Sequence, residues 1–584
     1  MDKVDKAEVT RILDEVGDLL ELRGGNPFEV RAYQNAARAI GQVDDDVDEL
    51  VRSGAIARVP GLGKTLVQRV TELVTTGQMA FHQELLAEIP PGLREMLKIP
   101  GLGPKRIRQI HEALNISTLA ELRAAADAGT IAALPGFGAK SQEKILKGLD
   151  FVAEHADHYL YPVAEQDATA IAEALRALPQ VVRLSIAGSL RRHKEVVKDV
   201  DVVASVARES DRASVMDVLV GLPQVISVTG KGDTKTSVVL RPGIALDLRV
   251  VTDEEYPCTL HHFSGSKEHN IALRTRAQRA GIKINDYGLL RGEERIPVSD
   301  EHEFYRILGM DFIEPEMRED RGEIELALKG KLPKLVTEAD LRGILHVHST
   351  WSDGHATIRD MVEATIALGK RYLGMCDHSK AAAYANGLNE ETVKRQHDEI
   401  DQLNAEFGGN FRILKGTECD ILKDGALDYD DATLASFDFV VASVHSQFQL
   451  PPAEQTQRLI RALENPYTSI LGHPTGRILL QRDGYAPDLE AVIDRAGALG
   501  VAIELNADPL RADLDWRLHR RAVERGVLIP IDPDAHSPAG LANIGYGVGI
   551  ARKGWLTAAD VLNTRTVDDL LAWFAALRAR KGVK

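Results

Sequence analysis

Between Ser185 and Val203 the chain reads SIAGSLRRHKEVVKDVDVV, and the architecture of the central region follows from this stretch. Asp199 and Asp201 are two residues apart in a β-branched run, so on a strand both carboxylates point to one face. A second run, IALDLRVV, supplies Asp247 from a neighbouring strand. Three converging carboxylates suit two hard cations such as Mg²⁺ or Mn²⁺. Alone, an Asp-x-Asp pair is a weak signal, because many such aspartates lie at turns.

The segment AGSLRR, just before this pair, has the features of a triphosphate-binding turn. Gly188 and Ser189 permit close approach of the backbone to a phosphate, and Arg192 offers a positive partner. The combination with Asp199 and Asp201 resembles the nucleotidyltransferase palm of family X DNA polymerases. The resemblance implies that the three aspartates are the catalytic residues and that deoxynucleoside triphosphates are substrates.

The resemblance continues in HHFSGSKEHN, residues 261–270. By position it implies a nucleotide-binding role for four residues, which are His262, Phe263, Gly265 and Asn270. His262 occupies the place of a usual tyrosine, and Lys267 the place of an acidic residue of eukaryotic members. The resemblance therefore leaves discrimination against ribonucleotides open.

The N-terminal region carries one turn three times, in VPGLGKTLVQRV, IPGLGPKRIRQI and LPGFGAKSQEKI. The glycines permit a tight turn whose backbone N–H groups face outward at a helix N-terminus, where a phosphate oxygen can bind. A plain helix-turn-helix packing element is the alternative. The turns resemble helix-hairpin-helix motifs, which implies contacts to gapped or primed DNA from Gly61, Gly63, Gly101, Gly103, Gly136 and Gly138.

The region around the first hairpin also resembles a small lyase domain that removes deoxyribose phosphate through a lysine Schiff base. The position expected to hold that lysine is Arg69. Arginine stays protonated and cannot act as an amine nucleophile. Lys64 is close in sequence but is expected on the turn, so we predict weak or absent lyase activity.

From Ile344 onward, short apolar runs that end in His, Asp or Glu alternate with helical stretches. This alternation predicts a parallel α/β barrel with its chemistry at the carboxyl ends of the strands. In HVHS two histidines are two apart, so both imidazoles point one way. The candidate metal ligands are His346, His348, Asp353, His378, Glu418, His445, His473, Asp534 and His536.

This pattern resembles the PHP (polymerase and histidinol phosphatase) domain, and the resemblance implies up to three metals. One would be held by His346, His348, Glu418 and Asp534; a second by Glu418, His445 and His473; a third by Asp353, His378 and His536. His355 is an alternative to Asp353 on spacing alone. Mixed imidazole and carboxylate ligands suit Mn²⁺, Zn²⁺ or Fe²⁺ and phosphoester hydrolysis.

The fold class we predict is multidomain. It combines an α-helical helix-hairpin-helix region, an α+β nucleotidyltransferase palm with a thumb, and a distorted (β/α)7-type PHP barrel. The expected domains are 1–80 (lyase-like, first hairpin), 81–150 (fingers-like, second and third hairpins), 151–252 (palm), 253–320 (thumb), 321–342 (a linker with a short helix) and 343–584 (PHP).

Composition is compatible with this interpretation. The chain has 584 residues, 44% hydrophobic and 27% charged, with a formal net charge of −16. That net charge argues against nucleic acid as a partner, but a carboxylate-rich metal site can make the total charge acidic while a basic groove remains elsewhere.

No signal peptide or membrane-spanning run is evident, so we expect a cytoplasmic protein. Three separated cysteines are expected to be buried and unpaired, and a monomer is the default expectation.

The sequence predicts a repair DNA polymerase that fills gaps and carries a metal-dependent 3′-5′ exonuclease in its PHP domain. In the alternative, only the PHP domain is competent, as a DNA 3′-end nuclease or phosphatase. A third interpretation, a DNA-binding scaffold, would require both metal sites to be empty. A small-molecule phosphatase is disfavoured because it has no use for three phosphate-binding hairpins.

Overall fold

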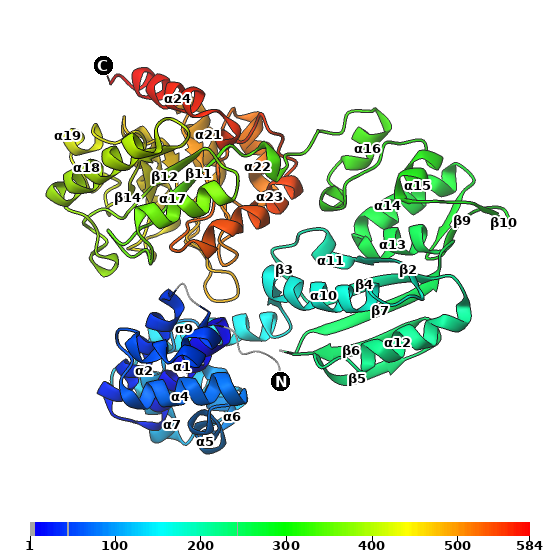
Figure 1. The fold of residues 1–584 in the computed structure, drawn as a ribbon, viewed down its shortest axis with the longest axis horizontal. Coiled ribbons are helices and arrows are strands. Elements are labelled where there is room, and N and C mark those ends of the chain that lie inside the picture. Colours follow the sequence, from blue (N-terminus) through cyan, green and yellow to red (C-terminus); the bar gives the residue numbers. More distant parts are fainter. Residues whose placement is uncertain (1–5, 44–45, 242, 584) are drawn as a thin grey trace. The chain divides into compact units, whose positions relative to one another are not determined.

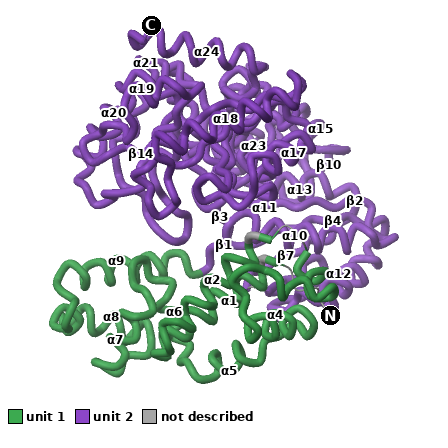
Figure 2. The backbone as a smooth tube through the Cα atoms, turned by 60° about the vertical axis from the view of Figure 1, so that its left-hand side comes forward, with its two compact units in different colours: residues 1–156 green, residues 157–584 purple. Residues whose placement is uncertain are grey.

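The computed structural model describes residues 6–43, 46–241 and 243–583. The chain divides into two compact units, Met1–Ala156 and Asp157–Lys584 (Figure 2). We describe each unit by itself. In the described residues every helix is too short or too polar to span a lipid bilayer.

The first unit is helical, as predicted, and its apolar residues form a core of their own (Figure 1). Each predicted turn lies between a short helical segment and the helix that follows it. The elements are α1 (Lys6–Arg23), α2 (Pro27–Gln42), α3 (Val47–Ser53), η1 (Ala55–Arg58), α4 (Lys64–Thr76), α5 (Ala80–Glu88), α6 (Pro91–Met96), α7 (Pro104–Leu114), α8 (Leu119–Asp127), η2 (Ile131–Ala133) and α9 (Ala139–His155).

The second unit begins with a sheet in the order β2-β4-β7-β6-β5, in which only β4 and β7 are parallel. Successive side chains of β4 point to alternate faces of the sheet. Val200 and Val202 therefore pack in the core shared with α10 and α12, and Val203 packs on the face covered by α13. The elements are β1 (Tyr159–Leu160), α10 (Tyr161–Arg176), β2 (Val181–Ile186), α11 (Gly188–Arg191), β3 (Val196–Val197), β4 (Asp199–Val206), α12 (Arg212–Val220), β5 (Val225–Lys231), β6 (Lys235–Leu240) and β7 (Ala245–Thr252).

Helices and a small antiparallel sheet follow, around a separate apolar core. Residues 321–342 were expected to form a polar linker with a short helix, but Glu323 within them is buried, as is Arg318 just before them. Arg318 pairs with Glu301 at 2.6 Å, and Glu323 pairs with His269 at 2.6 Å. The elements are α13 (Tyr256–Ser264), α14 (Lys267–Arg279), β8 (Lys283–Asn285), β9 (Gly288–Arg291), β10 (Glu294–Ile296), α15 (Glu301–Ile307), η4 (Pro315–Met317) and α16 (Glu323–Leu328).

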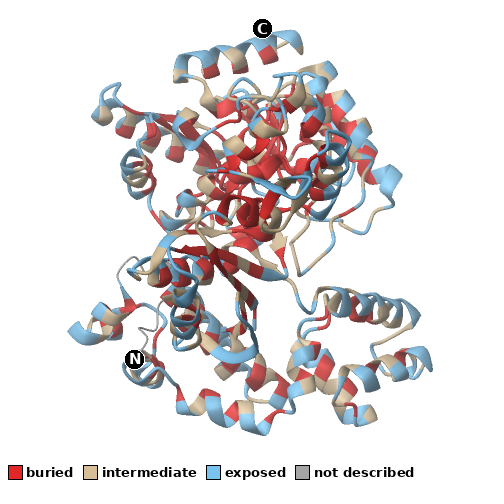
Figure 3. Cartoon of the chain, turned by 90° about the vertical axis from the view of Figure 1, so that its right-hand side faces the viewer, coloured by how far each residue is buried: buried red, intermediate tan, exposed pale blue. Residues whose placement is uncertain are grey.

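The remainder of the unit is a parallel barrel whose strands are almost entirely buried (Figure 3). The strands form three parallel sheets, in the orders β11-β12-β13, β14-β15-β16-β17 and β18-β19. A parallel bridge between Val347 and Ala535 brings the end of β19 beside β11 and closes the barrel, which confirms the predicted fold class. The strands are β11 (Gly343–Val347), β12 (Tyr372–Met375), β13 (Arg412–Lys415), β14 (Glu418–Asp420), β15 (Val441–Ser443), β16 (Ile470–Leu471), β17 (Ala502–Ile503), β18 (Leu505–Asn506) and β19 (Ile531–Asp532).

Helices lie between most of these strands, since parallel neighbours need a crossover connection. They are α17 (Ile358–Ala367), α18 (Glu390–Phe407), α19 (Asp431–Leu434), α20 (Pro452–Glu464), α21 (Leu489–Leu499) and α22 (Trp516–Glu524), and α23 (Asn543–Lys553) and α24 (Val567–Arg580) follow β19. Cys258, Cys376 and Cys419 are free and buried, as expected.

The buried Glu323 makes a testable contribution to stability. Its carboxylate accepts from the His269 ring and from the backbone N–H groups of Asp320 and Arg321. Glu323→Ala would leave the buried His269 ring without its carboxylate partner and the two backbone N–H groups without their acceptor, and we expect a loss of about 3 kcal/mol of unfolding free energy. Urea unfolding measures it. Glu325→Ala, on the exposed face of the same helix, is the control, and an equal loss in both variants would contradict the assignment.

Candidate active sites

The three predicted catalytic aspartates converge on one face of the sheet. Asp201 on β4 lies directly opposite Asp247 on β7, and Asp199 precedes Asp201 by two residues on the same face. Asp247 accepts a hydrogen bond from Ser237 at 2.6 Å and pairs with Lys235 at 2.6 Å. The parallel register of β4 and β7 therefore assembles the group that the sequence predicted.

The electrostatics of this group favour a bound cation. Burial, together with the charges of Asp199 and Asp247, raises the pKa of Asp201 to about 7. Burial and Asp247 also raise the pKa of Asp199. Both shifts reflect charged carboxylates that lack enough positive neighbours, and a divalent cation would supply them.

Gly188 is required by close approach to Asp201. Its backbone is left-handed, with φ of +64°, and a Cβ atom built on it would lie 2.3 Å from Asp201 Oδ2. Any larger residue would therefore displace the carboxylate. Glycine at this position lets the first residue of α11 lie directly against the carboxylate group.

A cavity of about 570 Å³ adjoins the aspartates. The lining includes Asp199 and Asp201 together with each predicted nucleotide-binding residue, namely Gly188, Ser189, Arg192, His262, Phe263, Gly265 and Asn270. Lys267, Ile271 and Arg274 complete it. The residues that the resemblance implied are thus neighbours, drawn from β4, α11 and the region of helices α13 and α14.

His262, which stands where a tyrosine was expected, is held by charged neighbours. Arg274 Nη2 lies 2.9 Å from His262 Nδ1 and donates to Asp286 at 3.0 Å. Burial lowers the pKa of His262. A neutral imidazole therefore faces the cavity, with a smaller and differently placed polar edge than a tyrosine offers.

The six hairpin glycines adopt the geometry that a phosphate-binding turn needs. Within each pair the first glycine is left-handed, and the second immediately precedes α4, α7 or α9. A Cβ built on the second glycine of each pair would meet no atom within 4 Å. The pairs are Gly61 and Gly63, Gly101 and Gly103, and Gly136 and Gly138. The N-terminus of each following helix is thus open to an approaching anion.

Arg69 lies in an aromatic setting. Its guanidinium carbon is 3.6 Å from the Phe81 ring centroid and 5.4 Å from that of Tyr33, as in cation–π contacts. Lys64 was expected on the turn but is the first residue of α4, because the turn ends at Gly63. Lys64 is exposed.

In the barrel, Glu418 on β14 is the centre of the predicted metal site. Its carboxylate is buried and lies within 3.6 Å of a nitrogen of each of five imidazoles. The shortest distance is 2.8 Å, to His473 Nε2, and the other rings are those of His346, His348, His378 and His445.

Among the described residues, three groups of ligand atoms come close enough to hold a metal. The first is His346, His348, Glu418 and Asp534, as the resemblance implied. The others differ in detail: His378 joins Glu418 and His445, while His348 joins Asp353, His378 and His536. His473 is outside the second group but contacts two of its members, Glu418 at 2.8 Å and the ring of His445. His355 is exposed and outside all three groups, so geometry favours Asp353 over this alternative.

Unpaired buried atoms indicate that this site fits metal ions. His346 Nε2, His348 Nε2 and Glu418 Oε2 are buried without a hydrogen-bond partner among the described residues. Buried polar atoms without partners are costly unless something else binds them. Imidazole nitrogens and carboxylate oxygens facing one point are the ligand set of Zn²⁺, Mn²⁺ or Fe²⁺.

The structure adds residues that the sequence did not single out. Glu504, from the loop between β17 and β18, accepts from His346 Nδ1 and from the backbone N–H of His473. Asp420 accepts from His445 Nδ1 at 3.2 Å. Arg511 Nε lies 3.5 Å from Asp534 Oδ2, beside the cluster. The run VAIELN ends in polar residues, but nothing in its spacing identifies Glu504 as a support rather than a ligand.

A nucleotidyltransferase-type palm with a thumb, joined to a PHP-type metal site, is the class that this fold and these sites define. Family models match residues 4–79 (helix-hairpin-helix domain), 93–150 (SAM-like helix-hairpin-helix tandem), 259–319 (DNA polymerase beta thumb) and 345–508 (PHP domain).

Curated relatives agree with these matches. The chain is 40% identical over 572 residues to the DNA polymerase/3′-5′ exonuclease PolX of Bacillus subtilis, covering 97% of this chain and 99% of that protein. It is 28% identical over 232 residues to a probable phosphatase of Thermoanaerobacter, which covers 38% of this chain and 89% of that protein. The chain belongs to the family of bacterial PolX DNA polymerases with a PHP domain.

Glu504 gives a test of the metal site. Because its carboxylate orients His346 and the backbone of His473, Glu504→Gln should weaken metal binding about 10- to 100-fold. Metal content after dialysis against a graded chelator, measured by mass spectrometry, reports the change. Glu524→Gln, exposed on α22, is the control, and equal metal retention in both variants would show that Glu504 does not support the ligands.

Proposed function

We propose that the chain extends DNA primers in gaps at the Asp199, Asp201 and Asp247 site and shortens DNA 3′ ends at the barrel site. The observation that carries the polymerase assignment is the register of Asp201 against Asp247 beside a cavity lined by Gly188, Ser189 and Arg192. The polymerase/exonuclease activities named for the B. subtilis relative support both halves of the proposal.

In the polymerase half, the aspartates would hold two Mg²⁺ or Mn²⁺ ions. Bound there, such ions activate a primer 3′ hydroxyl and stabilise the departing pyrophosphate. Ser189 and the backbone around Gly188 would receive the triphosphate, with Arg192 as its positive neighbour. Phe263 and Asn270 would contact the nucleotide, and His262 would take the place of the usual tyrosine.

In the barrel half, the three ligand groups would hold up to three Mn²⁺, Zn²⁺ or Fe²⁺ ions, which lower the pKa of bound water and neutralise phosphodiester oxygens. Glu504 and Asp420 would fix the orientation of His346 and His445. Arg511, close to Asp534, would pair with a phosphate oxygen of the DNA end. His536, at the exposed rim of the cluster, would lie nearest to solvent.

The helix-hairpin-helix turns would bind the phosphates of gapped DNA without reading its sequence. This proposal rests on the open N-termini of α4, α7 and α9. The predicted domain boundaries, the cytoplasmic location and the monomeric state stay predictions.

A second candidate keeps only the barrel active, as a 3′-end nuclease or phosphatase. It is favoured by the probable phosphatases that match the barrel region, among them one from Syntrophotalea carbinolica, 29% identical over 246 residues, 39% of this chain and 93% of that protein. His262 in the nucleotide cavity is the feature that would limit extension.

Reciprocal substitutions separate the two candidates. Asp201→Ala should reduce primer extension at least 1,000-fold and leave 3′ shortening intact, while Glu418→Gln should do the reverse, because each removes ligands from one site only. A 5′-labelled primer on gapped DNA with Mn²⁺ reports both activities on one gel. Extension that survives in Asp201→Ala would contradict the aspartate assignment, and no extension by the unaltered chain would favour the second candidate.

Arg69 stands at the position where the lyase lysine is expected, and this substitution predicts that the chain forms no Schiff base with deoxyribose phosphate. Borohydride trapping on a 5′-deoxyribose-phosphate substrate should yield no covalent product with the unaltered chain, since arginine cannot form the Schiff base. Arg69→Lys would place an amine between Phe81 and Tyr33 and should yield a trapped product. Lys64→Ala is the control: trapping by the unaltered chain that disappears in Lys64→Ala would assign the chemistry to Lys64 instead.

A further inference from the structure

Two adjacent arginines bind Ser264, the last residue of α13, beside the nucleotide cavity. Arg191 Nη1 donates to Ser264 Oγ at 2.6 Å, and Arg192 Nη1 donates to the Ser264 carbonyl. A Cβ built on Gly265 would lie 2.9 Å from Arg192 Nη1, so the guanidinium is packed directly against this glycine. The positions of Gly265 and of the Arg192 side chain are therefore linked.

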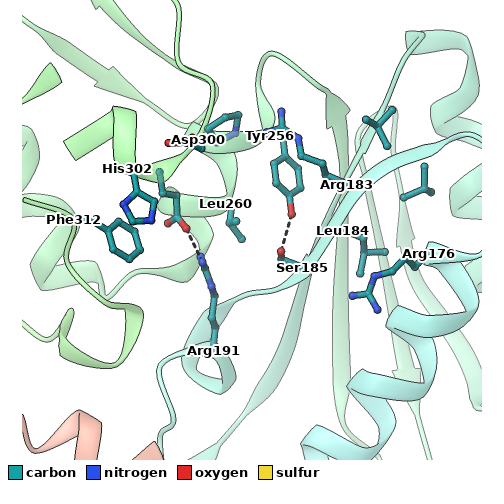
Figure 4. A pocket seen from close by; sticks show the side chains of 14 residues that line it. Arg176, Arg183, Leu184, Ser185, Arg191, Tyr256, Leu260, Asp300, His302 and Phe312 are labelled. Carbon is teal, nitrogen blue, oxygen red and sulfur yellow. Dashed lines mark hydrogen bonds and ion pairs between the residues drawn. The ribbon is translucent and has the colours of Figure 1, made fainter. Parts of the chain in front are cut away.

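Arg191 is anchored from within the region of the palm and thumb. Its Nη2 donates to Glu301 Oε2 at 2.6 Å, and Glu301 also pairs with the buried Arg318. Figure 4 shows Arg191 in a pocket that also contains Ser185 and Tyr256 from neighbouring elements. The lining of this pocket includes Arg191 but neither Arg192 nor any of the three aspartates.

Arg192 is anchored differently, through a residue of the barrel region. Its Nε donates to Glu319 Oε1 at 3.0 Å, and the same oxygen accepts from Lys553 Nζ at 2.5 Å. Lys553 Nζ also donates to the backbone carbonyl of Arg192 at 3.0 Å. Lys553 is the last residue of α23, the helix that follows the metal-ligand segment of Asp534 and His536.

The Lys553 ammonium is buried and has few possible hydrogen-bond partners. The side chain is 0% exposed, and Nζ lies 4.6 Å from the Trp516 ring centroid. Trp516 in turn donates through Nε1 to Glu195 at 3.2 Å, in the segment that follows Arg192. A buried ammonium needs a carboxylate and further acceptors, and Glu319 and the Arg192 carbonyl are the ones the structure provides.

We propose that Lys553 and Glu319 are positioning residues for the nucleotide site, acting through Arg192. The barrel region would then have two roles, since it carries its own metal cluster and also completes the support of the triphosphate-binding turn. The inference rests on the proposed polymerase function of the aspartate site. It assigns no reaction step to Lys553, which lies outside the residues that line the nucleotide cavity.

The test measures KM and kcat for deoxynucleotide in primer extension, and 3′ shortening without nucleotides, on the full chain. Lys553→Met and Glu319→Gln should each raise KM about tenfold, change kcat less than threefold and leave shortening unaltered. The double variant should raise KM by less than the product of the two single effects, because both substitutions remove the same Lys553–Glu319 contact.

Arg552→Met is the matched control. Arg552 adjoins Lys553 on the same helix and pairs with Glu316 at 2.6 Å, but does not contact Arg192. An equal rise in KM in this variant, or a double variant whose two effects multiply, would overturn the proposal. If Lys553→Met loses its thermal transition, the isosteric Glu319→Gln carries the test, and an unchanged KM there overturns it.

Asp201→Ala, assayed in parallel, separates this proposal from the one on which it rests. Loss of extension in Asp201→Ala with normal KM in Lys553→Met and Glu319→Gln would refute only the positioning role. Persistent extension in Asp201→Ala would refute the aspartate assignment, and with it the basis for the inference.

Discussion

Charged carboxylates held close to other ionisable side chains are the constraint on which both sites depend. Asp199, Asp201 and Asp247 are brought together by two parallel strands, and the rise in the pKa of Asp201 expresses the cost of that proximity. In the barrel, Glu418 meets the opposite situation, because surrounding imidazoles hold its pKa well below the usual range. Each arrangement is costly in isolation and favourable around cations, so binding and folding are coupled at both sites.

The backbone around these groups is shaped by the same requirement. Gly188 has a left-handed backbone at a position where any side chain would clash with Asp201. His346 and Asp534, two barrel ligands, also have positive φ values. Residues other than glycine rarely adopt this conformation, and it is typically retained where a functional geometry demands it.

Most of the fold could be predicted from the sequence because its signals are local. Paired aspartates on a strand, repeated Pro-Gly turns and histidines at strand ends each fix a short piece of structure, and the register of β4 with β7 brought the aspartates together as expected. Contacts between distant segments were not predictable. Glu323 belongs to a charge-dense stretch that looked like a linker, and Arg318 comes just before it; only their partners His269 and Glu301 explain their burial. For the same reason Glu504 and Lys553 gave no signal: each acts through a residue far away in the chain.

Closure of the barrel by β11 and β19 has a consequence for the order in which the protein is made. The bridge from Val347 to Ala535 joins the first strand to the segment that follows the last one, and metal-ligand residues flank both of its ends. During synthesis the ring of strands stays open until Ala535 has left the ribosome. A chain that stops before β19 would lack the final strand, the ligands Asp534 and His536 and the helix α23, so the metal cluster is complete only in molecules translated past His536.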